Sequence, residues 1–288
     1  MILIDYNQVV IANFMAQSKS LKEDVSVDLL RHMILNTLRL YRSKYSEEYG
    51  ELVICCDSKN YWRKKIFPYY KAARKEIRKA SNVDWNTLFE ALETVREELI
   101  TIFPYKTLIV DTAEADDIIG TLVHKYWQQE EKILIISSDK DFMQLQIYPN
   151  VEQYSPLMKT FVSTEDPQKF LFEHVVNGDR GDGVPNILSH DATFVNKERQ
   201  KRITNKFRAN HIAQNRVEGG FRIFFPNEQV QRNFQRNVSL VDLKAIPENI
   251  KKDIIDQYES YQEKDRSQIF QYFIKNRLKN LMSDIQEF

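Results

Sequence analysis

Cysteine is scarce in this sequence of 288 residues, because only Cys55 and Cys56 occur, next to each other in ELVICCD. Neighbouring residues on a strand point to opposite faces, so these two thiols cannot readily form a disulfide with each other. The pair therefore predicts buried, reduced thiols in a cytoplasmic protein.

Net charge and long apolar runs are absent as well. The 41 basic residues balance the 41 acidic ones, so any attraction to a polyanion must come from uneven placement of the charges. The N-terminal MILIDYNQVV meets a charge at Asp5, and no apolar run reaches the length of a membrane span. We expect a soluble, unexported protein without a membrane partner.

Four short apolar runs, at residues 1–4, 52–56, 107–110 and 132–137, are typical of buried strands. Helical patterns alternate with them: one follows a predicted N-cap at Ser26, and others cover 84–102 and 115–127. This alternation predicts an α/β fold with a parallel sheet covered on both faces.

Acidic residues follow these predicted strands. Asp5, Asp57, Asp111 and Asp139 come after the four runs, and the carboxyl ends of parallel strands meet at one edge of a sheet, where ligands bind. We interpret Asp111 as an ordinary helix-start residue and expect the other three to share a cleft.

Further acids form short clusters in AEADDIIG, SSDKDF and NGDRGDGVPN; they are Glu114, Asp116, Asp117, Asp139, Asp141, Asp179 and Asp182. Two unit charges about 4 Å apart repel by roughly 4 kcal/mol at an effective dielectric near 20, so such a cleft needs cations. With no histidine or cysteine in these loops, oxygen-only ligation predicts Mg²⁺ or Mn²⁺. Two such ions about 4 Å apart can hydrolyse a phosphodiester.

Two other kinds of acidic site share features with these clusters. A strand ending in D-x-D resembles the nucleophile loop of haloacid-dehalogenase phosphatases, but Met143 stands where Thr or Val is usual, and EADD stays unexplained. An EF-hand does not fit, because SDKDFMQLQIYP lacks the loop glycine and the terminal glutamate. The open alternatives are a DxD phosphatase and a non-catalytic DNA-binding replication accessory protein.

Basic residues gather between Lys59 and Lys79, where nine oppose the single acid Glu76. If 71–79 is helical, an exposed stripe of Lys71, Arg74, Lys75 and Arg78 could follow phosphates. Four aromatic residues between these charges could stack on unpaired bases; they are Tyr61, Trp62, Tyr69 and Tyr70. Eight Lys or Arg against two Glu between Lys197 and Arg222 predict a second surface, for duplex.

Strand-like runs become rare after about residue 178, and the chain ends in helical patterns. The sequence therefore predicts a domain at 1–178, with the basic segment at about 59–80, and a mostly helical DNA-binding domain at 179–288. Acids that bind metal next to a phosphate-binding stripe describe a nuclease.

Six motifs carry a family resemblance: LID, CCDSKNYWR, YYKAARK, AEADDIIG, SSDKDFMQL and GDRGDGVPNI. In this order and spacing they resemble the structure-specific 5′ nucleases, the flap endonuclease group, and phage members are the nearest likeness. The resemblance covers almost the whole chain. It implies a PIN-like nuclease core, a helical arch over the active site and a helix-three-turn-helix module that begins at GDRGD.

The resemblance also implies roles for individual residues. One metal site would use Asp5, Asp57, Glu114, Asp116 and Asp139, and the second would use Asp117, Asp141, Asp179 and Asp182. Lys71 and Arg74 would steer the scissile phosphate as catalytic residues, and Arg63 would support the same phosphates. The nucleic-acid-binding set implied in this way is Arg63, Tyr70, Lys71, Arg74, Lys75 and Arg78.

The implied activity is a Mg²⁺-dependent 5′ to 3′ exonuclease and flap endonuclease on RNA:DNA and DNA duplexes, which removes lagging-strand primers. Implied partners are forked or flapped nucleic acid, with a single-strand DNA-binding protein and a sliding clamp as candidates, and a monomer is expected. The sequence departs from the family where the hairpin G-x-G-x-x-x-A is replaced by VPNILSHDATFVNKERQ. The hairpin's duplex contact and bound K⁺ are therefore not carried over.

Overall fold

The four predicted strands lie in the parallel part of a six-stranded sheet in the computed structural model, which describes residues 1–18, 26–130, 132–215 and 220–288. The strands are β1 (Ile2–Asp5), β2 (Leu52–Cys55), β3 (Lys106–Leu108), β4 (Ile133–Ile136), β5 (Val151–Ser155) and β6 (Thr160–Val162). Their order is β3-β2-β1-β4-β5-β6, and only β6 runs antiparallel to its neighbour. The predicted parallel sheet is confirmed, and β5 and β6 extend it.

The helices are α1 (Tyr6–Ser18), α2 (Val27–Tyr49), α3 (Arg63–Ile66), α4 (Arg74–Lys79), α5 (Trp85–Ile102), α6 (Ala115–Tyr126), α7 (Pro167–Asn177), α8 (Asn205–His211), α9 (Glu228–Val241), α10 (Glu248–Glu259), α11 (Ser267–Lys275) and α12 (Lys279–Met282). Three short 3₁₀ helices are η1 (Lys140–Ile147), η2 (Leu243–Ala245) and η3 (Ile285–Glu287), and a hairpin joins β7 (Ile212–Asn215) to β8 (Gly220–Ile223). The predicted N-cap Ser26 accepts a hydrogen bond from the Leu29 N–H at 3.2 Å.

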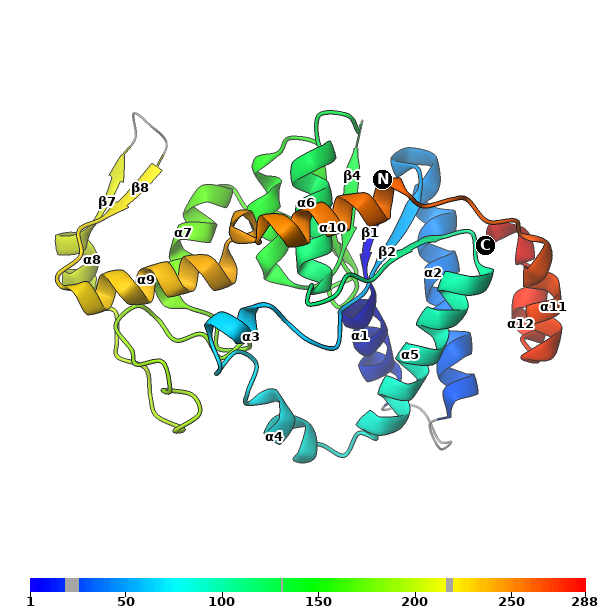
Figure 1. Ribbon diagram of the computed structural model, residues 1–288, viewed down its shortest axis with the longest axis horizontal. Helices are drawn as coiled ribbons and strands as arrows, with labels where there is room; N and C mark the ends of the chain where they lie inside the picture. Colours follow the sequence, from blue (N-terminus) through cyan, green and yellow to red (C-terminus); the bar gives the residue numbers. More distant parts are fainter. Residues whose placement is uncertain (19–25, 131, 216–219) are drawn as a thin grey trace.

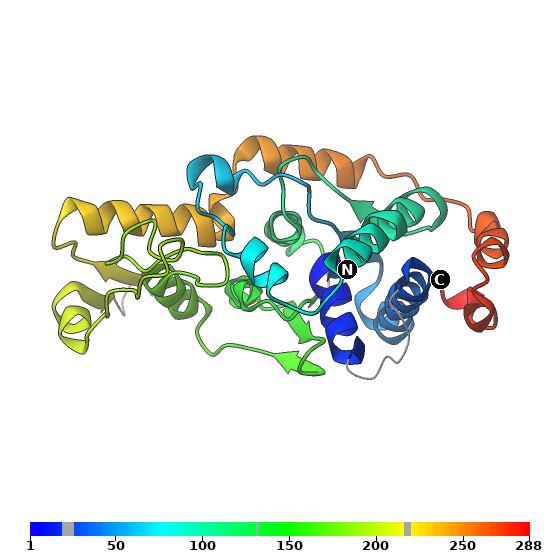
Figure 2. The ribbon, with the colours of Figure 1, turned by 90° about the horizontal axis from the view of Figure 1, so that it is seen from below.

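Both faces of the sheet are covered, which explains why its first strands are apolar throughout. Helices α1, α2 and α5 pack on one face, and α6 and α10 pack on the other (Figures 1 and 2). Cys55 and Cys56 are both free and buried, and they belong to the cores on opposite faces. Because neighbouring residues of the strand point to opposite faces, the two thiols do not form a disulfide, as predicted.

The second half of the chain extends away from the sheet and then returns to it. Helices α7 and α9 pack together with α8 and the β7–β8 hairpin at one end of the molecule (Figure 1). Ile250 and Ile254 of α10 then pack into the core below α6, and Phe273 and Phe288 join the core on the opposite face. Hydrophobic contacts thus join residues on both sides of position 178. The division into two domains at that position stays a prediction.

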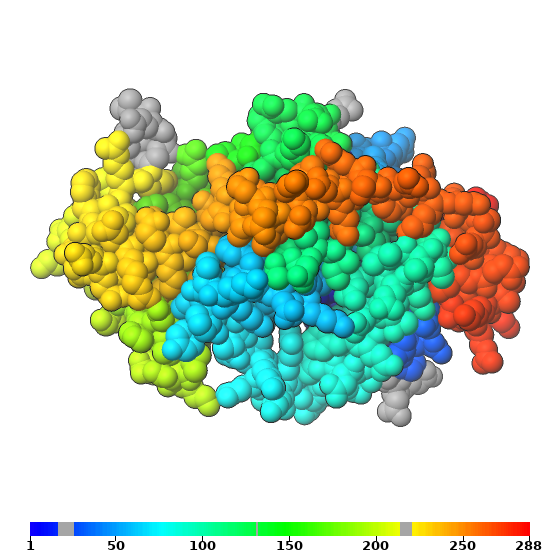
Figure 3. Space-filling model, in the orientation of Figure 1, coloured from blue at the N-terminus to red at the C-terminus, as the bar shows by residue number. Residues whose placement is uncertain are grey.

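The basic segment 59–80 lies between β2 and α5 in the chain. It leaves β2, forms the short helices α3 and α4, and reaches α5 on the far side (Figure 1). Figure 3, in the orientation of Figure 1, shows segment 59–80 on the surface, below α9 and α10. We call residues 59–80 the arch. A search of the described residues finds no helix with the length and apolarity needed to cross a membrane.

Candidate active site and metal centre

Four of the predicted acids line one cavity of about 560 Å³ at the carboxyl edge of the sheet. Asp5 ends β1, Asp57 follows β2 and Asp139 follows β4, while Asp116 lies in the first turn of α6. Adjacent parallel strands bring these ends together, although the residues are up to 134 positions apart in the chain. Asp5, Asp57 and Asp139 therefore share one cleft, as predicted.

Hydrogen bonds orient these carboxylates before any cation binds. Asp57 accepts from the Asn7 side chain and from the Ala115 N–H, each at 2.8 Å. Asp5 accepts from the Ser137 hydroxyl at 2.9 Å and from the Gln8 N–H at 3.3 Å. Fixed oxygens at one end of a cavity are the donors that a hard divalent cation needs.

The acids of this cavity destabilise each other's charge. Burial, and then the negative charge of Asp57, raises the pKa of Asp5 to about 7. Burial and the charge of Asp139 also raise the pKa of Asp116 well above its ordinary value. Since a bound cation would offset both effects, the residues fit a divalent metal.

A second group contains a residue that the sequence interpretation missed. Asp141 and Asp179 lie beside His174 of α7, and one ligand atom from each of the three lies within 4.8 Å of the others. An imidazole nitrogen thus lies among these carboxylates, and oxygen-only ligation stays a prediction for this group. His174 is on a helix rather than in an acidic loop, and its place five residues before Asp179 in HVVNGD was the available signal.

Glu114 and Asp117, by contrast, are turned toward cations of the arch. Arg63 donates to Glu114 at 2.9 Å and lies 2.8 Å from an oxygen of Asp117, and the Trp62 indole donates to Asp117 at 3.0 Å. Lys71 also pairs with Glu114. These two acids do not line the 560 Å³ cavity, and their assignment as metal ligands stays a prediction.

Asp182 connects the GDRGD segment to the arch. Its carboxylate accepts from the Tyr70 hydroxyl at 2.7 Å, pairs with Arg74, and lies 3.6 Å from the Lys71 ammonium. The predicted second metal set is thus only partly brought together, since Asp141 and Asp179 are adjacent while Asp117 and Asp182 are paired with basic residues of the arch.

Two expectations for the arch need correction. Arg63 is 2% exposed and Tyr70 is also 2% exposed, so neither side chain can contact a phosphate or a base directly in this arrangement. Trp62 is buried as well and cannot stack on bases. The cause is electrostatic, because buried Glu114 and Asp117 require these donors at close range.

The predicted helical stripe is also different from the observed arrangement. Lys71 lies before α4 with a φ of 55°, in the left-handed region, so it does not share a helix face with the other three residues. Lys71 and Arg74 nevertheless reach the 560 Å³ cavity together with Arg78, whose guanidinium lies over the rings of Trp85 and Phe89. Lys75 is exposed and does not line that cavity.

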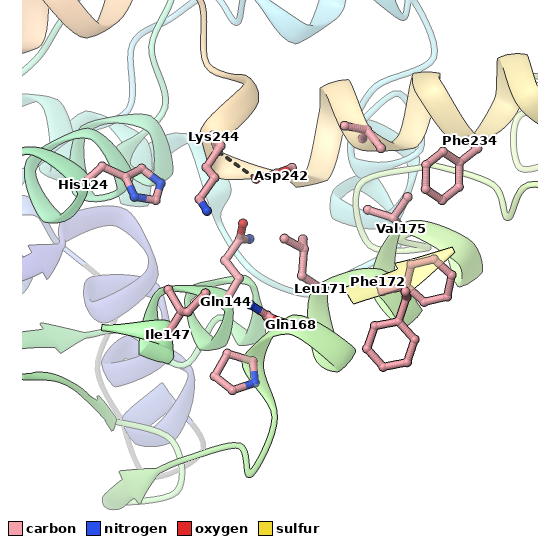
Figure 4. Close-up of a pocket in the computed structure, with 13 residues that line it drawn as sticks. His124, Gln144, Ile147, Gln168, Leu171, Phe172, Val175, Phe234, Asp242 and Lys244 are labelled. Carbon is pink, nitrogen blue, oxygen red and sulfur yellow. Dashed lines mark hydrogen bonds between the residues drawn. The ribbon is translucent and has the colours of Figure 1, made fainter. Parts of the chain in front are cut away.

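Two further features lie away from the acidic cavity: the residue Asp111 and a second hollow. Asp111 lies in an exposed turn before α6, whose N-cap is Glu114, so its interpretation as a helix-start residue is wrong. A hollow of about 310 Å³ between α7, η1 and α9 is lined mainly by apolar side chains such as Leu171, Phe172 and Phe234 (Figure 4). Asp242 is the one carboxylate among its described lining residues, so the hollow does not offer the group of acids found at the sheet edge.

Two family models match the chain. The N-terminal resolvase-like domain of 5′-3′ exonucleases matches residues 1–174, and the C-terminal domain of T4 RNase H matches residues 167–288. The ribonuclease H of Enterobacteria phage T4 is 33% identical over 293 aligned positions, which cover 99% of this chain and 95% of that protein. A 5′-3′ exonuclease of Buchnera aphidicola subsp. Schizaphis graminum is 30% identical over 54% of this chain and 53% of its own length.

Solved structures with the same fold come from bacteriophage T5. Its 5′-exonuclease with bound zinc has a TM-score of 0.61 at 17% identity and covers 90% of this chain and 98% of its own. Its flap endonuclease, in a pseudo-enzyme-product complex with DNA and metal ions, has a TM-score of 0.62 at 16% identity over 90% of this chain and 99% of its own. With both family models matched and the phage relative aligned over nearly its whole length, this chain belongs to the 5′-3′ exonuclease family of phosphodiester-cleaving nucleases.

Proposed function

We propose that this protein is a 5′ to 3′ exonuclease and flap endonuclease that acts on RNA:DNA and DNA duplexes with two Mg²⁺ ions, for which Mn²⁺ can substitute. Removal of RNA primers from lagging-strand fragments would be its role in replication. The observation that carries the proposal is one cavity lined by Asp5, Asp57, Asp116 and Asp139 and by the cations Lys71 and Arg74.

The chain's own residues support this chemistry in two ways. The acids would hold the divalent ions, which when bound supply Lewis-acid polarisation of the phosphate and activation of water. Lys71 and Arg74 present positive charge to the same cavity, where it can orient a phosphate and stabilise the negative charge that develops during cleavage. Their assignment as catalytic residues rests on this placement.

The ion pairs around the arch suggest how those two residues are held. Lys71 is anchored by Glu114, the N-cap of α6, and Arg74 by Asp182 of the GDRGD segment. Arg63, buried below them, offsets the charges of Glu114 and Asp117. We propose that this buried network positions the arch, while the phosphate itself contacts Lys71, Arg74 and Arg78.

A direct test uses one flap substrate and one RNA:DNA hybrid, each labelled at the 5′ end in one sample and at the 3′ end in another. In Mg²⁺, short 5′-labelled products should appear first, and a chelator should stop their release. Products that shorten only from the 3′ end would contradict the proposed polarity. Turnover of small phosphate esters alone would favour a DxD phosphatase, and salt-sensitive flap binding without any cleavage would favour a non-catalytic accessory protein.

The remaining expectations stay predictions. They concern contact with a sliding clamp or a single-strand DNA-binding protein, the monomeric state, and the location in a bacterial host's cytoplasm. The segment that replaces the family's hairpin, residues 184–200, is described throughout and forms turns and irregular backbone rather than a helix. Whether it binds duplex or K⁺ is likewise a matter for experiment.

A further inference from the structure

His174 lies between two acids of the metal centre. Its Nε2 atom is 3.2 Å from Asp141 Oδ1 and 3.3 Å from Asp179 Oδ2. The side chain comes from the last turn of α7, while Asp141 lies in the first turn of η1 and Asp179 follows α7 in the GDRGD segment. Three separate parts of the chain therefore aim one donor atom each at a common point.

Two of these donor atoms have no hydrogen-bond partner among the described residues. His174 is 7% exposed, and its Nε2 lies at ion-pair distance from Asp141 Oδ1, but neither atom makes a hydrogen bond of ordinary geometry. A buried polar atom left without a partner costs about 1–3 kcal/mol, so two such atoms facing each other need a physical reason. A bound cation between them would satisfy both.

The imidazole ring is held in place from behind. Phe170, one helical turn earlier on α7, stacks on it with centroids 5.8 Å apart and an interplanar angle of 9°. Residues four apart lie on the same face of a helix, so this contact is built into the local sequence FLFEH. The ring is thus oriented toward the two carboxylates before any ion arrives.

The spacing of the donors suits a coordination shell. Neighbouring ligands of an octahedral ion with bonds of about 2.1 Å are about 3.0 Å apart, close to the two distances from His174 Nε2. Lys140 lies 3.0 Å from Asp179 Oδ2, but its side chain is half exposed and can turn to solvent when a cation binds. The group can therefore close on an ion with little rearrangement.

We propose that His174 is a metal ligand, so that the Asp141–Asp179 site has a mixed nitrogen and oxygen donor set and prefers a first-row transition-metal ion, such as Mn²⁺ or Co²⁺, to Mg²⁺. Imidazole nitrogen suits transition metals, whereas Mg²⁺ prefers an all-oxygen shell. This inference rests on the proposed two-metal function and assigns the metal preference of one of its sites. The other site, around Asp5 and Asp139, keeps oxygen ligands only.

The test measures the metal directly in the full chain. Mn²⁺ is added to protein labelled with ¹⁵N-histidine, and pulsed electron paramagnetic resonance detects nitrogen bonded to the ion. The chain has 5 histidines, so His174→Gln assigns the signal, and His190→Gln, at an exposed histidine, is the matched control. We expect nitrogen coupling in the parent and in His190→Gln and its loss in His174→Gln.

Calorimetric titration with Mn²⁺, Co²⁺ and Mg²⁺ gives the second readout. His174→Gln should weaken Mn²⁺ and Co²⁺ binding at least about tenfold and leave Mg²⁺ binding much less affected. Equal affinities in parent and variant, or no nitrogen coupling in the parent, would overturn the proposal. If His174→Gln does not fold, His174→Asn takes its place in the assignment, and absence of nitrogen coupling in the parent still overturns the proposal.

Failure of this inference and failure of the proposed function are distinguishable. Cleavage of 5′ ends in Mg²⁺ without any nitrogen coupling would retain the nuclease and remove His174 as a ligand. Nitrogen coupling that depends on His174, without any 5′ cleavage, would retain the metal site and remove the proposed activity.

Discussion

Lys71 is joined to Asp182 through both its backbone and its side chain. The Lys71 N–H donates to the Asp182 carbonyl oxygen at 2.8 Å, and the ammonium lies 3.6 Å from Asp182 Oδ2. Gly183 follows with a φ of +75°, and a Cβ there would lie 3.0 Å from the Tyr69 carbonyl oxygen. Only glycine suits both conditions, so this contact joins the arch closely to the GDRGD segment.

Replacing Lys71 by methionine should slow 5′ cleavage at least about a hundredfold, because the cavity loses a positive charge that a phosphate would meet. The metal-free protein should also lose about 1–3 kcal/mol of unfolding free energy, since buried Glu114 loses a partner. The sequence interpretation treated Lys71 as exposed, and that is wrong because its side chain is 11% exposed. Rates from single-turnover assays and chemical denaturation measure the two effects.

Lys75→Met is the matched control for Lys71, because Lys75 is an exposed residue of the same segment. It should change stability by less than about 0.5 kcal/mol. If the two variants lost the same amount of activity, general attraction of the arch for nucleic acid would explain both results.

Arg63→Met should lower the free energy of unfolding by about 3–5 kcal/mol, because it removes one partner of a buried ion-pair network. Glu114 and Asp117, at 1% and 0% side-chain exposure, would keep their charges with fewer compensating donors. Urea denaturation of the metal-free protein at neutral pH measures the loss. A fully stable variant with weakened flap binding would mean that Arg63 leaves its buried position to contact phosphate.

The stability of the metal-free protein should decrease as the pH rises through about 7. The pKa of Asp5 is about 7 in the folded chain and lies above its ordinary value, mainly because of burial, so the folded state binds this proton more tightly than the unfolded state. The resulting stabilisation is complete below the ordinary pKa near 3.8 and is lost as the pH passes through about 7.

Thermal unfolding at pH 6 and pH 8, with chelator and with saturating Mg²⁺, tests this dependence. The difference between the two pH values should be largest with chelator, because a bound cation favours the ionised carboxylate. Asp5→Asn should reduce the difference. A metal-free protein that is more stable at pH 8 than at pH 6 would contradict the expected sign.

Asp139→Asn should separate activity from stability. Cleavage should be abolished while flap binding persists, and the metal-free protein should gain about 0.5–2 kcal/mol because one repelling charge leaves the cavity. Asp111→Asn is the control, since Asp111 is an exposed acid outside the cavity, and it should change neither quantity measurably. Loss of stability in Asp139→Asn would mean that the hydrogen bond from the Asp141 N–H to Asp139, at 3.0 Å, outweighs the repulsion.

The local sequence was sufficient to predict the parallel sheet and the convergence of Asp5, Asp57 and Asp139. Short continuous apolar runs identify the buried strands, and the carboxyl ends of parallel strands lie at the same edge of the sheet. The N-cap of α2, Ser26, is predictable in the same way, because a capping side chain acts within three residues of its own position. These features depend on neighbours in the chain.

Burial and partner choice could not be predicted in this way. Arg63 and Tyr70 resemble surface residues in their basic, aromatic segment, but the folded chain places them against Glu114, 51 and 44 positions away. His174 meets Asp141 only because α7 packs on η1. Such contacts join residues far apart in sequence and depend on how elements pack, so tertiary structure alone decides which charges face the cavity and which compensate each other in the interior.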